Sequence, residues 1–300
     1  MNDELAQARS AMNRIPLFNG YRGPVERLGG LTNLVFRAGD YCLRIPGKGT
    51  EEYINRANEA VAAREAAKAG VSPELLYFDD KSGLMVTRFI DEVVTMSQDL
   101  FNSRVGAAAR AGRAFRQLHE KAARFPFRFE LFSMIDNYLS VLSGKDVALP
   151  HGYHDVVAEA QKLRSLLDAH ATKLAPCHCD PLAENFLDTG ARMWIVDWEY
   201  SGMNDPMWDL GDLSVEAGFD DAQDEEMLAA YFAGAPGPAD HGRMVVYKAM
   251  CDLLWTLWGL IQLANANPAD DFRKYADNRF ARCKALMATP DFVRHVSAIG

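Results

Sequence analysis

The sequence predicts an α+β protein with two lobes, a small β-rich lobe over residues 1–90 and a large helical lobe over residues 91–300. Strand and turn patterns fill the first ninety residues, and helical patterns fill most of the remainder. The length of 300 residues favours two lobes over one, since a domain has about 150 residues on average. A hydrophobic content of 49% indicates a folded chain with a real core.

Charge and cysteine content narrow the classes of function. The formal net charge is −9, which argues against binding to duplex nucleic acid and suits a cationic ligand. The most apolar run is 253–264, and extending it back to residue 244 takes in Lys248 and Asp252, so we expect a buried helix and no membrane span. The polar start of the chain predicts no secretory signal, and five irregularly spaced cysteines indicate reduced thiols in a cytoplasmic protein.

The elements of the first lobe follow from short apolar runs between turn residues. Apolar runs bounded by Gly, Pro and Asp predict strands, and an Ala-rich charged segment before Gly70 predicts a helix. The expected strands are 25–28, 34–38, 41–45, 75–78 and 84–89, and the expected helix is 55–69.

Helices dominate the second lobe. Ser103 is a suitable N-cap for a helix that reaches about residue 120. Further helices are expected at 131–142, 154–170, 224–233, 243–264 and 270–287. One strand pair, 185–187 with 193–196, interrupts them.

Polar residues flank this strand pair in a pattern that suits phosphate chemistry. Asn185 opens the first strand and Asp197 follows the second, so an antiparallel hairpin places both at one end, with strands about 4.8 Å apart. Oxygen ligands at that spacing can share Mg²⁺. Asp180 precedes Asn185 by five residues, which is the layout of a kinase catalytic loop. The alternative is a polar loop whose side chains only satisfy turns.

The segment 178–216 resembles the aminoglycoside-phosphotransferase and choline-kinase superfamily, which implies a two-lobed protein-kinase-like fold. Residues 195–202 (Ile-Val-Asp-Trp-Glu-Tyr-Ser-Gly) and 209–212 (Asp-Leu-Gly-Asp) are similar to choline and ethanolamine kinases. Residues 29–33 and 43–47 also resemble bacterial choline kinases. The resemblance implies that Asp180 accepts or orients the proton of a substrate hydroxyl, while Asn185 and Asp197 hold Mg²⁺.

The resemblance also implies that residues 29–33 form the loop over the ATP phosphates. Gly30 lets the backbone approach phosphate closely, and Thr32 and Asn33 can donate hydrogen bonds. The chain has no Gly-x-Gly-x-x-Gly and no Walker lysine, which excludes a P-loop fold.

Arg44 stands where protein kinases carry a lysine, and choline kinases resemble this chain in having Arg there. A guanidinium can bridge phosphate oxygens. We expect Glu59 to anchor it, with Glu65 as the alternative. Taken alone, Arg44 could equally be a surface residue of an edge strand.

Aromatic residues near the C-terminus complete the predicted site. Trp255 and Trp258 share a helix face, and with Tyr275 they match the C-terminal region of choline kinases, which implies a cage for a trimethylammonium group. Glu199 and Glu216 match acidic positions of that pocket. Core packing is the alternative for the two tryptophans.

The expected function is an ATP- and Mg²⁺-dependent kinase that phosphorylates the hydroxyl of choline, a small cationic alcohol. Cys179 replaces a more usual Asn, and an aromatic position of the eukaryotic enzymes falls near Phe219 or Asp221, which leaves choline and ethanolamine both open. Thiamine and aminoglycosides are further possible acceptors. A nucleotide-binding regulatory protein without turnover is the alternative of a different class. Oligomeric state is not indicated.

Overall fold

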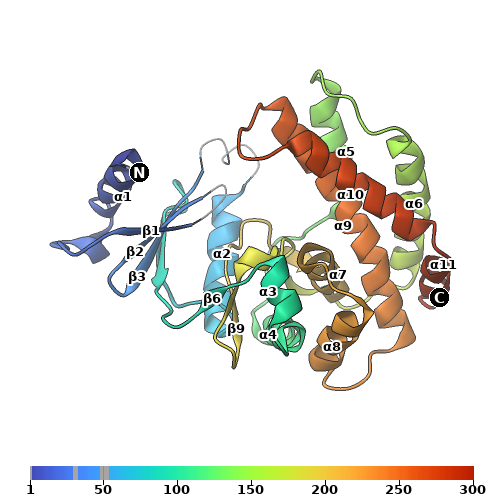
Figure 1. The fold of residues 1–300 in the computed structure, drawn as a ribbon, viewed down its shortest axis with the longest axis horizontal. Helices are drawn as coiled ribbons and strands as arrows, with labels where there is room; N and C mark the ends of the chain where they lie inside the picture. Colours follow the sequence, from blue (N-terminus) through green and yellow to red (C-terminus); the bar gives the residue numbers. More distant parts are fainter. Residues whose placement is uncertain (1, 30–32, 48–49, 51–53) are drawn as a thin grey trace.

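The structure is a computed structural model that describes residues 2–29, 33–47, 50 and 54–300. Figure 1 shows a small sheet at one side of the molecule and a larger group of helices at the other. The sheet is antiparallel and has the strand order β1-β2-β3-β5-β4. Its strands are β1 (Glu26–Gly29), β2 (Leu34–Ala38), β3 (Tyr41–Ile45), β4 (Leu75–Phe78) and β5 (Met85–Arg88). The five predicted strands of this lobe are therefore confirmed.

Strand β3 has buried side chains on both faces of the sheet. Successive side chains of a strand point to opposite sides of the sheet. Leu43 points into a small apolar cluster that also contains Phe36 and Ile15, below the N-terminal helix α1 (Asn2–Met12). Arg44, the next residue, therefore points to the other face, toward helix α2.

Helix α2 (Arg56–Lys68) confirms the predicted helix of this lobe. Asn55 caps its first turn by accepting a hydrogen bond from the Asn58 backbone N–H at 3.1 Å. Glu59 is buried on the inner side, whereas Glu65 pairs with Lys68 at 2.7 Å. Glu59, and not Glu65, is thus the residue that α2 offers to Arg44.

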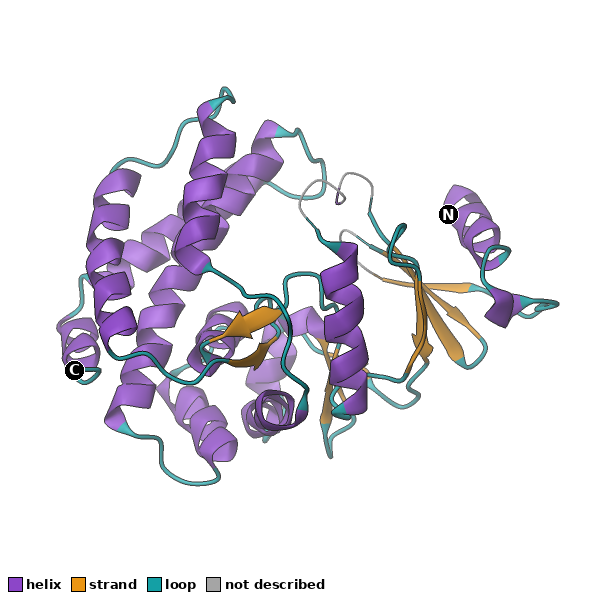
Figure 2. Cartoon of the chain, turned by 180° about the vertical axis from the view of Figure 1, so that it is seen from behind, coloured by secondary structure: helices purple, strands orange, loops and turns teal. Residues whose placement is uncertain are grey.

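The second lobe is built around α9 (Pro238–Ala264), against which α5, α7, α10 and α11 pack (Figure 2). The other helices are α3 (Gln98–Ser103), α4 (Ala107–Lys121), α5 (Leu131–Ser143), α6 (Tyr153–Ala169), α7 (Pro206–Ala217), α8 (Asp221–Phe232), α10 (Phe272–Met287) and α11 (Pro290–Ser297). By length and composition α9 could cross a membrane, but 83% of its most apolar window is buried inside the protein. It is therefore the central core helix that the sequence predicted.

One predicted helix start was wrong. Ser103 does not cap a helix; it ends α3, whose own N-cap is Ser97. The following helix, α4, begins after Gly106, which has a φ of +73°. Glycine adopts the left-handed backbone conformation easily, so the new helix starts after Gly106 and not after Ser103. Helices α1, α3, α7 and α11 were not predicted.

The hairpin that carries the predicted metal ligands is present, with one correction. Strands β8 (Phe186–Asp188) and β9 (Met193–Ile195) pair antiparallel, and β6 (Val94–Thr95) extends them to three strands. Asn185 does not open β8; it ends a 3-10 helix, Ala183–Asn185, because its N–H bonds to the Leu182 carbonyl at 2.9 Å. Strand β7 (Ala175–Cys177) pairs separately with β10 (Gly202–Asn204). The loop that precedes the β8–β9 hairpin follows β7 directly.

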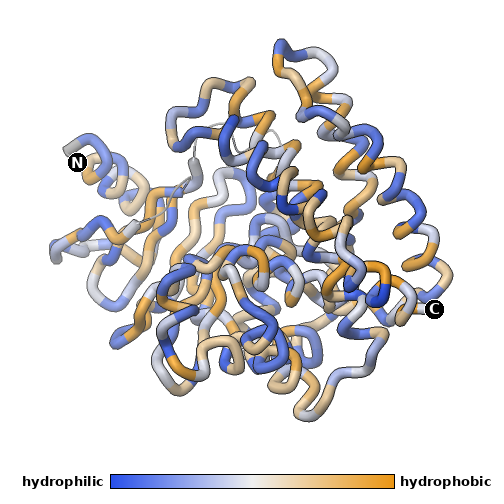
Figure 3. Tube along the Cα trace, turned by 45° about the vertical axis from the view of Figure 1, so that its right-hand side comes forward, coloured by the Kyte–Doolittle hydropathy of each residue, from blue (hydrophilic) through white to orange (hydrophobic). Residues whose placement is uncertain are grey.

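Two apolar clusters lie within the described residues. The smaller one contains residues between Ala8 and Val86, and the larger one runs through the helical lobe. Ala62 and Ala66 of α2 belong to the larger cluster, so this helix packs on both lobes. Hydrophobic and hydrophilic residues alternate along the helices and strands, as each element turns one side inward (Figure 3). The division at residue 90 remains a prediction.

Candidate active site

A loop after β7 carries Asp180, and a buried carboxylate of α7 holds this loop in place. Asp209 has no exposed surface and accepts hydrogen bonds from the backbone N–H groups of His178, at 2.7 Å, and Cys179, at 2.8 Å. Its Oδ2 also lies 3.0 Å from His119 Nε2. Cys179 has a φ of +68°, a strained conformation for a non-glycine residue. Asp209 therefore stabilises a strained turn immediately before Asp180.

His178 joins this loop to the segment that contains Asp197. Its Nδ1 accepts from the Asp180 N–H at 3.3 Å, so Nε2 carries the hydrogen and donates to the Val196 carbonyl at 2.9 Å. The ring packs against Trp198 with centroids 4.8 Å apart. Burial lowers the pKa of His178, which keeps the ring neutral. The side chain thus supports the loop and has no free nitrogen for proton transfer.

Asn185 and Asp197 lie at the same end of the β8–β9 hairpin, as predicted. The Val196 N–H donates to the Asn185 carbonyl at 2.9 Å, and Asn185 Nδ2 donates to the Asp180 carbonyl at 3.1 Å. This leaves Asn185 Oδ1 without a hydrogen-bond partner in the described part of the chain. Burial, followed by the nearby charges of Glu216 and Asp197, raises the pKa of Asp180 well above its ordinary value. Oxygen donors from three segments are therefore directed to one place.

Arg44 lies in a buried network of ion pairs, on the side of Asp197 that faces the sheet. It forms an ion pair with Glu59, and its Nη1 lies 2.9 Å from Asp197 Oδ1 and 3.6 Å from Glu199 Oε1. Arg56 bonds to Glu59 at 2.7 Å and to Glu199 at 2.5 Å. Burial raises the pKa values of all three carboxyl groups.

Three carboxylates thus face two guanidinium groups, an arrangement with one negative charge in excess. One oxygen from each of Glu59, Asp197 and Glu199 lies within 4.8 Å of the others. Such a donor set fits a hard divalent cation, which prefers carboxylate and amide oxygens. The structure therefore places Glu199 with this charge network, where its carboxylate is already bonded to Arg56.

Asn33 connects the predicted phosphate loop to the same network. Its Nδ2 donates to Asp197 Oδ2 at 3.4 Å, and its Oδ1 accepts from the Gly47 N–H at 3.1 Å. Gly30 and Thr32, the other two residues assigned to the loop, lie outside the described residues.

The three predicted cage residues come together on two adjacent helices. Trp258 of α9 contacts Tyr275 of α10 with ring centroids 5.7 Å apart, and Trp255 contacts Tyr200 at 5.3 Å. Gly259 makes the first contact possible, because a Cβ there would lie 2.6 Å from Tyr275 Cδ1. Tyr200 follows the Asp197–Glu199 segment directly in the chain, so the aromatic cluster adjoins the charge network.

Glu216 lies beside these aromatic residues but is bonded to a side chain that the sequence did not single out. Arg279 of α10 is buried, pairs with Glu216, and lies 3.2 Å from Asp252 Oδ1. Its Cζ is 4.6 Å from the centroid of the Tyr275 ring. Arg279 is four residues after Tyr275, so the two share a helix face, and this spacing was the available signal.

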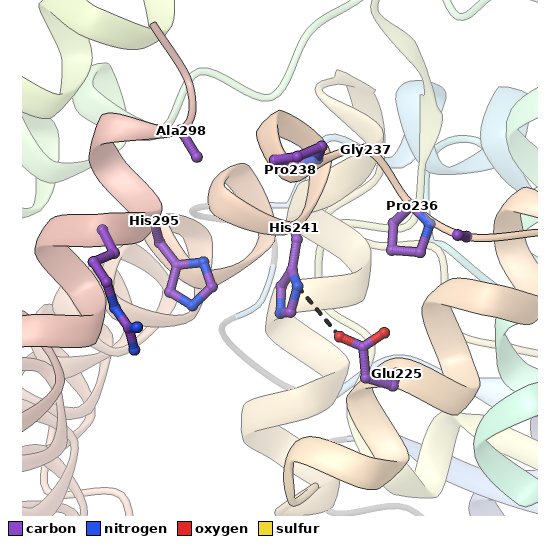
Figure 4. Close-up of a pocket in the computed structure, with 9 residues that line it drawn as sticks. Glu225, Pro236, Gly237, Pro238, His241, His295 and Ala298 are labelled. Carbon is purple, nitrogen blue, oxygen red and sulfur yellow. Dashed lines mark ion pairs between the residues drawn. The ribbon is translucent and has the colours of Figure 1, made fainter.

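A separate cavity lies between α8, the start of α9 and α11 (Figure 4). Its volume is about 540 Å³, and its lining includes His241, His295 and Glu225, with 3.3 Å between His241 Nδ1 and Glu225 Oε1. None of its lining residues is one of the predicted site residues. It plays no part in the chemistry of the Asp180 loop.

The two-lobed fold and the arrangement of the predicted site residues are those expected of a phosphotransferase, and comparison with known proteins gives the class and the family. A family model described as choline/ethanolamine kinase matches residues 25–230. The chain is 69% identical to a choline/ethanolamine kinase family protein from Mesorhizobium loti, whose crystal structure has a TM-score of 0.93 and a coverage of 99% of both chains. The chain therefore belongs to the choline/ethanolamine kinase family.

More distant relatives agree with this assignment. The choline kinase LicA from Streptococcus pneumoniae is 26% identical, with a TM-score of 0.76 over 91% of this chain and 96% of that one. Protein LicA from Haemophilus influenzae is 28% identical over 89% of this chain and 81% of its own length. The protein is a small-molecule kinase, a phosphotransferase that acts on an alcohol group.

Proposed function

We propose that this kinase transfers the γ-phosphoryl group of ATP to the hydroxyl of choline, with Mg²⁺, and releases phosphocholine and ADP. The observation that carries the proposal is the meeting of two groups of residues. Asp180, which is bonded to Asn185, lies close enough to Tyr275 for its charge to act on that ring, and Tyr275 contacts Trp258 of the aromatic cluster. The first group suits phosphoryl transfer, and the second suits a quaternary ammonium group.

On the nucleotide side, the phosphates would face Arg44 and the two predicted metal ligands, of which Asp197 is in direct contact with Arg44. Asn185 Oδ1, which has no hydrogen-bond partner among the described residues, and Asp197 would hold Mg²⁺, and charge on the phosphate oxygens would thereby be neutralised. Arg44, held by Glu59, adds a fixed positive charge. A LicA structure of 27% identity and TM-score 0.71 was solved with AMP, which supports nucleotide use here.

On the acceptor side, Asp180 orients the choline hydroxyl and accepts its proton. The hydroxyl oxygen forms the new bond to the γ-phosphorus as the bond to the bridging oxygen of ADP breaks, and the proton moves to the carboxylate. Catalysis rests mainly on positioning and on charge neutralisation. The indole and phenol rings stabilise the trimethylammonium group by cation–π contacts, each of about 0.5–2 kcal/mol.

The test is release of ADP from Mg·ATP by purified protein with choline, ethanolamine, thiamine or an aminoglycoside as acceptor. Choline should stimulate release most strongly, and Asp180→Ala should lower turnover by orders of magnitude while the fold is kept. Stimulation by a different alcohol would refute choline as the acceptor. Wild-type turnover in Asp180→Ala would refute the site itself.

A further inference from the structure

We propose that Arg279 makes the acceptor site prefer a quaternary ammonium group to a primary one, because it occupies the carboxylate that would otherwise accept N–H bonds from the substrate. This inference rests on the proposed function. It concerns the choice between choline and ethanolamine, which the sequence leaves open.

Arg279 engages two of the carboxylates beside the aromatic cluster, and the third, Asp180, is the one that the proposed reaction gives to the substrate hydroxyl. Arg279 pairs with Glu216 through one terminal nitrogen and with Asp252 through the other, at 3.2 Å. Arg282 bonds to Asp252 as well, at 2.6 Å and 3.0 Å. Two guanidinium groups thus meet two carboxylates, so the charges of Glu216 and Asp252 are balanced by Arg279 and Arg282.

The remaining unpaired polar atoms of this region are mostly donors. Trp255 Nε1, Trp258 Nε1 and Arg279 Nε are buried and make no hydrogen bond within the described residues. The one unpaired acceptor among them is Asp212 Oδ2, on a side chain with no exposed surface whose Oδ1 accepts from Cys251 Sγ at 2.8 Å. The buried atoms around the cluster that lack a partner in the described chain are therefore mostly donors, which do not satisfy an N–H group.

Ethanolamine and choline differ in the number of N–H donors that they bring into the site. The –NH₃⁺ group of ethanolamine has three N–H donors that lose water on entry, whereas the trimethylammonium group of choline has none. A donor left without an acceptor in a buried site is disfavoured, and one such loss changes affinity by about tenfold or more. Arg279 also packs over one face of Tyr275, which fixes the orientation of that ring.

The experiment compares kcat/KM for choline and for ethanolamine in the wild type, Arg279→Met and the control Arg282→Met. Arg279→Met frees Glu216, so the choline-to-ethanolamine ratio should fall by about tenfold or more, largely through KM for the amine. Arg282→Met removes the same kind of side chain from Asp252 but leaves Glu216 paired, because Arg279 bonds to both carboxylates. The choline-to-ethanolamine ratio of kcat/KM in Arg282→Met should therefore stay within about twofold of the wild-type ratio.

A double variant and a conservative variant complete the design. Adding Glu216→Gln to Arg279→Met removes the freed carboxylate and should restore most of the ratio. If Arg279→Met does not fold, Arg279→Lys decides, since a single ammonium nitrogen does not reproduce the contacts that two guanidinium nitrogens make with Glu216 and Asp252, and the ratio should fall by about threefold or more. An unchanged ratio in the folded variant overturns the inference. A wild type that phosphorylates neither amine refutes the proposed function instead.

Discussion

Asp209→Ala tests whether the α7 carboxylate holds the catalytic loop. Asp209 accepts hydrogen bonds from two buried backbone N–H groups, those of His178 and Cys179, at 2.7 and 2.8 Å. Each donor left unsatisfied in a buried site costs about 1–3 kcal/mol. Alanine should therefore lower the free energy of unfolding by about 2–6 kcal/mol. Asparagine keeps one acceptor oxygen, so Asp209→Asn should lose about half as much.

The same change should also reduce catalysis. Without Asp209, the Cys179 N–H loses its acceptor and, of the Cys179 backbone, only the carbonyl stays bonded, to Trp208 Nε1 at 3.2 Å, so the turn at φ +68° loosens and Asp180 moves with it. A displacement of about 1 Å at a reacting group can cost about 10²-fold in rate. Urea unfolding followed by tryptophan fluorescence gives the stability, and steady-state kinetics at low temperature gives kcat for the folded fraction. An Asp209→Ala protein with wild-type kcat and less than about 1 kcal/mol of destabilisation would refute the reasoning.

Three further predictions concern stability, pH and substrate affinity. Asp188→Ala leaves Arg110 buried without its partner at 2.7 Å and should lower the free energy of unfolding by about 3–5 kcal/mol in urea titrations, with kcat unchanged; destabilisation below about 1 kcal/mol would contradict it. The raised pKa of Asp180, caused by burial and by Glu216, means that kcat/KM falls as the pH drops through a value well above the usual one of about 3.9. Glu216→Gln removes a negative neighbour and should move this acid limb to lower pH, so an unmoved limb in the pH–rate profile counts against the assignment. Trp255→Ala should raise KM for choline and leave KM for ATP unchanged, and unchanged amine affinity would place the cage elsewhere.

Local patterns account for the parts of the fold that the sequence predicted. The hairpin of β2 and β3 turns at Gly39, which has a φ of +61°, and Asn55 caps α2, so both elements are encoded within a few residues. Helix α7 was missed although Asp205 and Pro206 form a regular helix start. Its residues are almost all buried, so it lacks the amphipathic pattern by which surface helices are recognised.

The site shows where sequence reasoning stops. Asp180, Asn185 and Asp197 lie close together in the chain, so their spacing predicted that they lie near one another in the fold. The spacing did not predict that Asn185 ends a 3-10 helix. Arg279 and Glu216 are 63 residues apart, and no local pattern indicates that a buried guanidinium joins them. Such a pairing depends on how α7, α9 and α10 pack, which is a property of the tertiary structure.

The most direct test of the central claim is ³¹P NMR of a reaction that contains the protein, Mg·ATP and choline. The account predicts a phosphomonoester resonance, that of phosphocholine, which grows in a one-to-one ratio with ADP and forms orders of magnitude more slowly with Asp180→Ala. ADP formed together with inorganic phosphate and without an ester, or an ester that forms at the wild-type rate in Asp180→Ala, would contradict it.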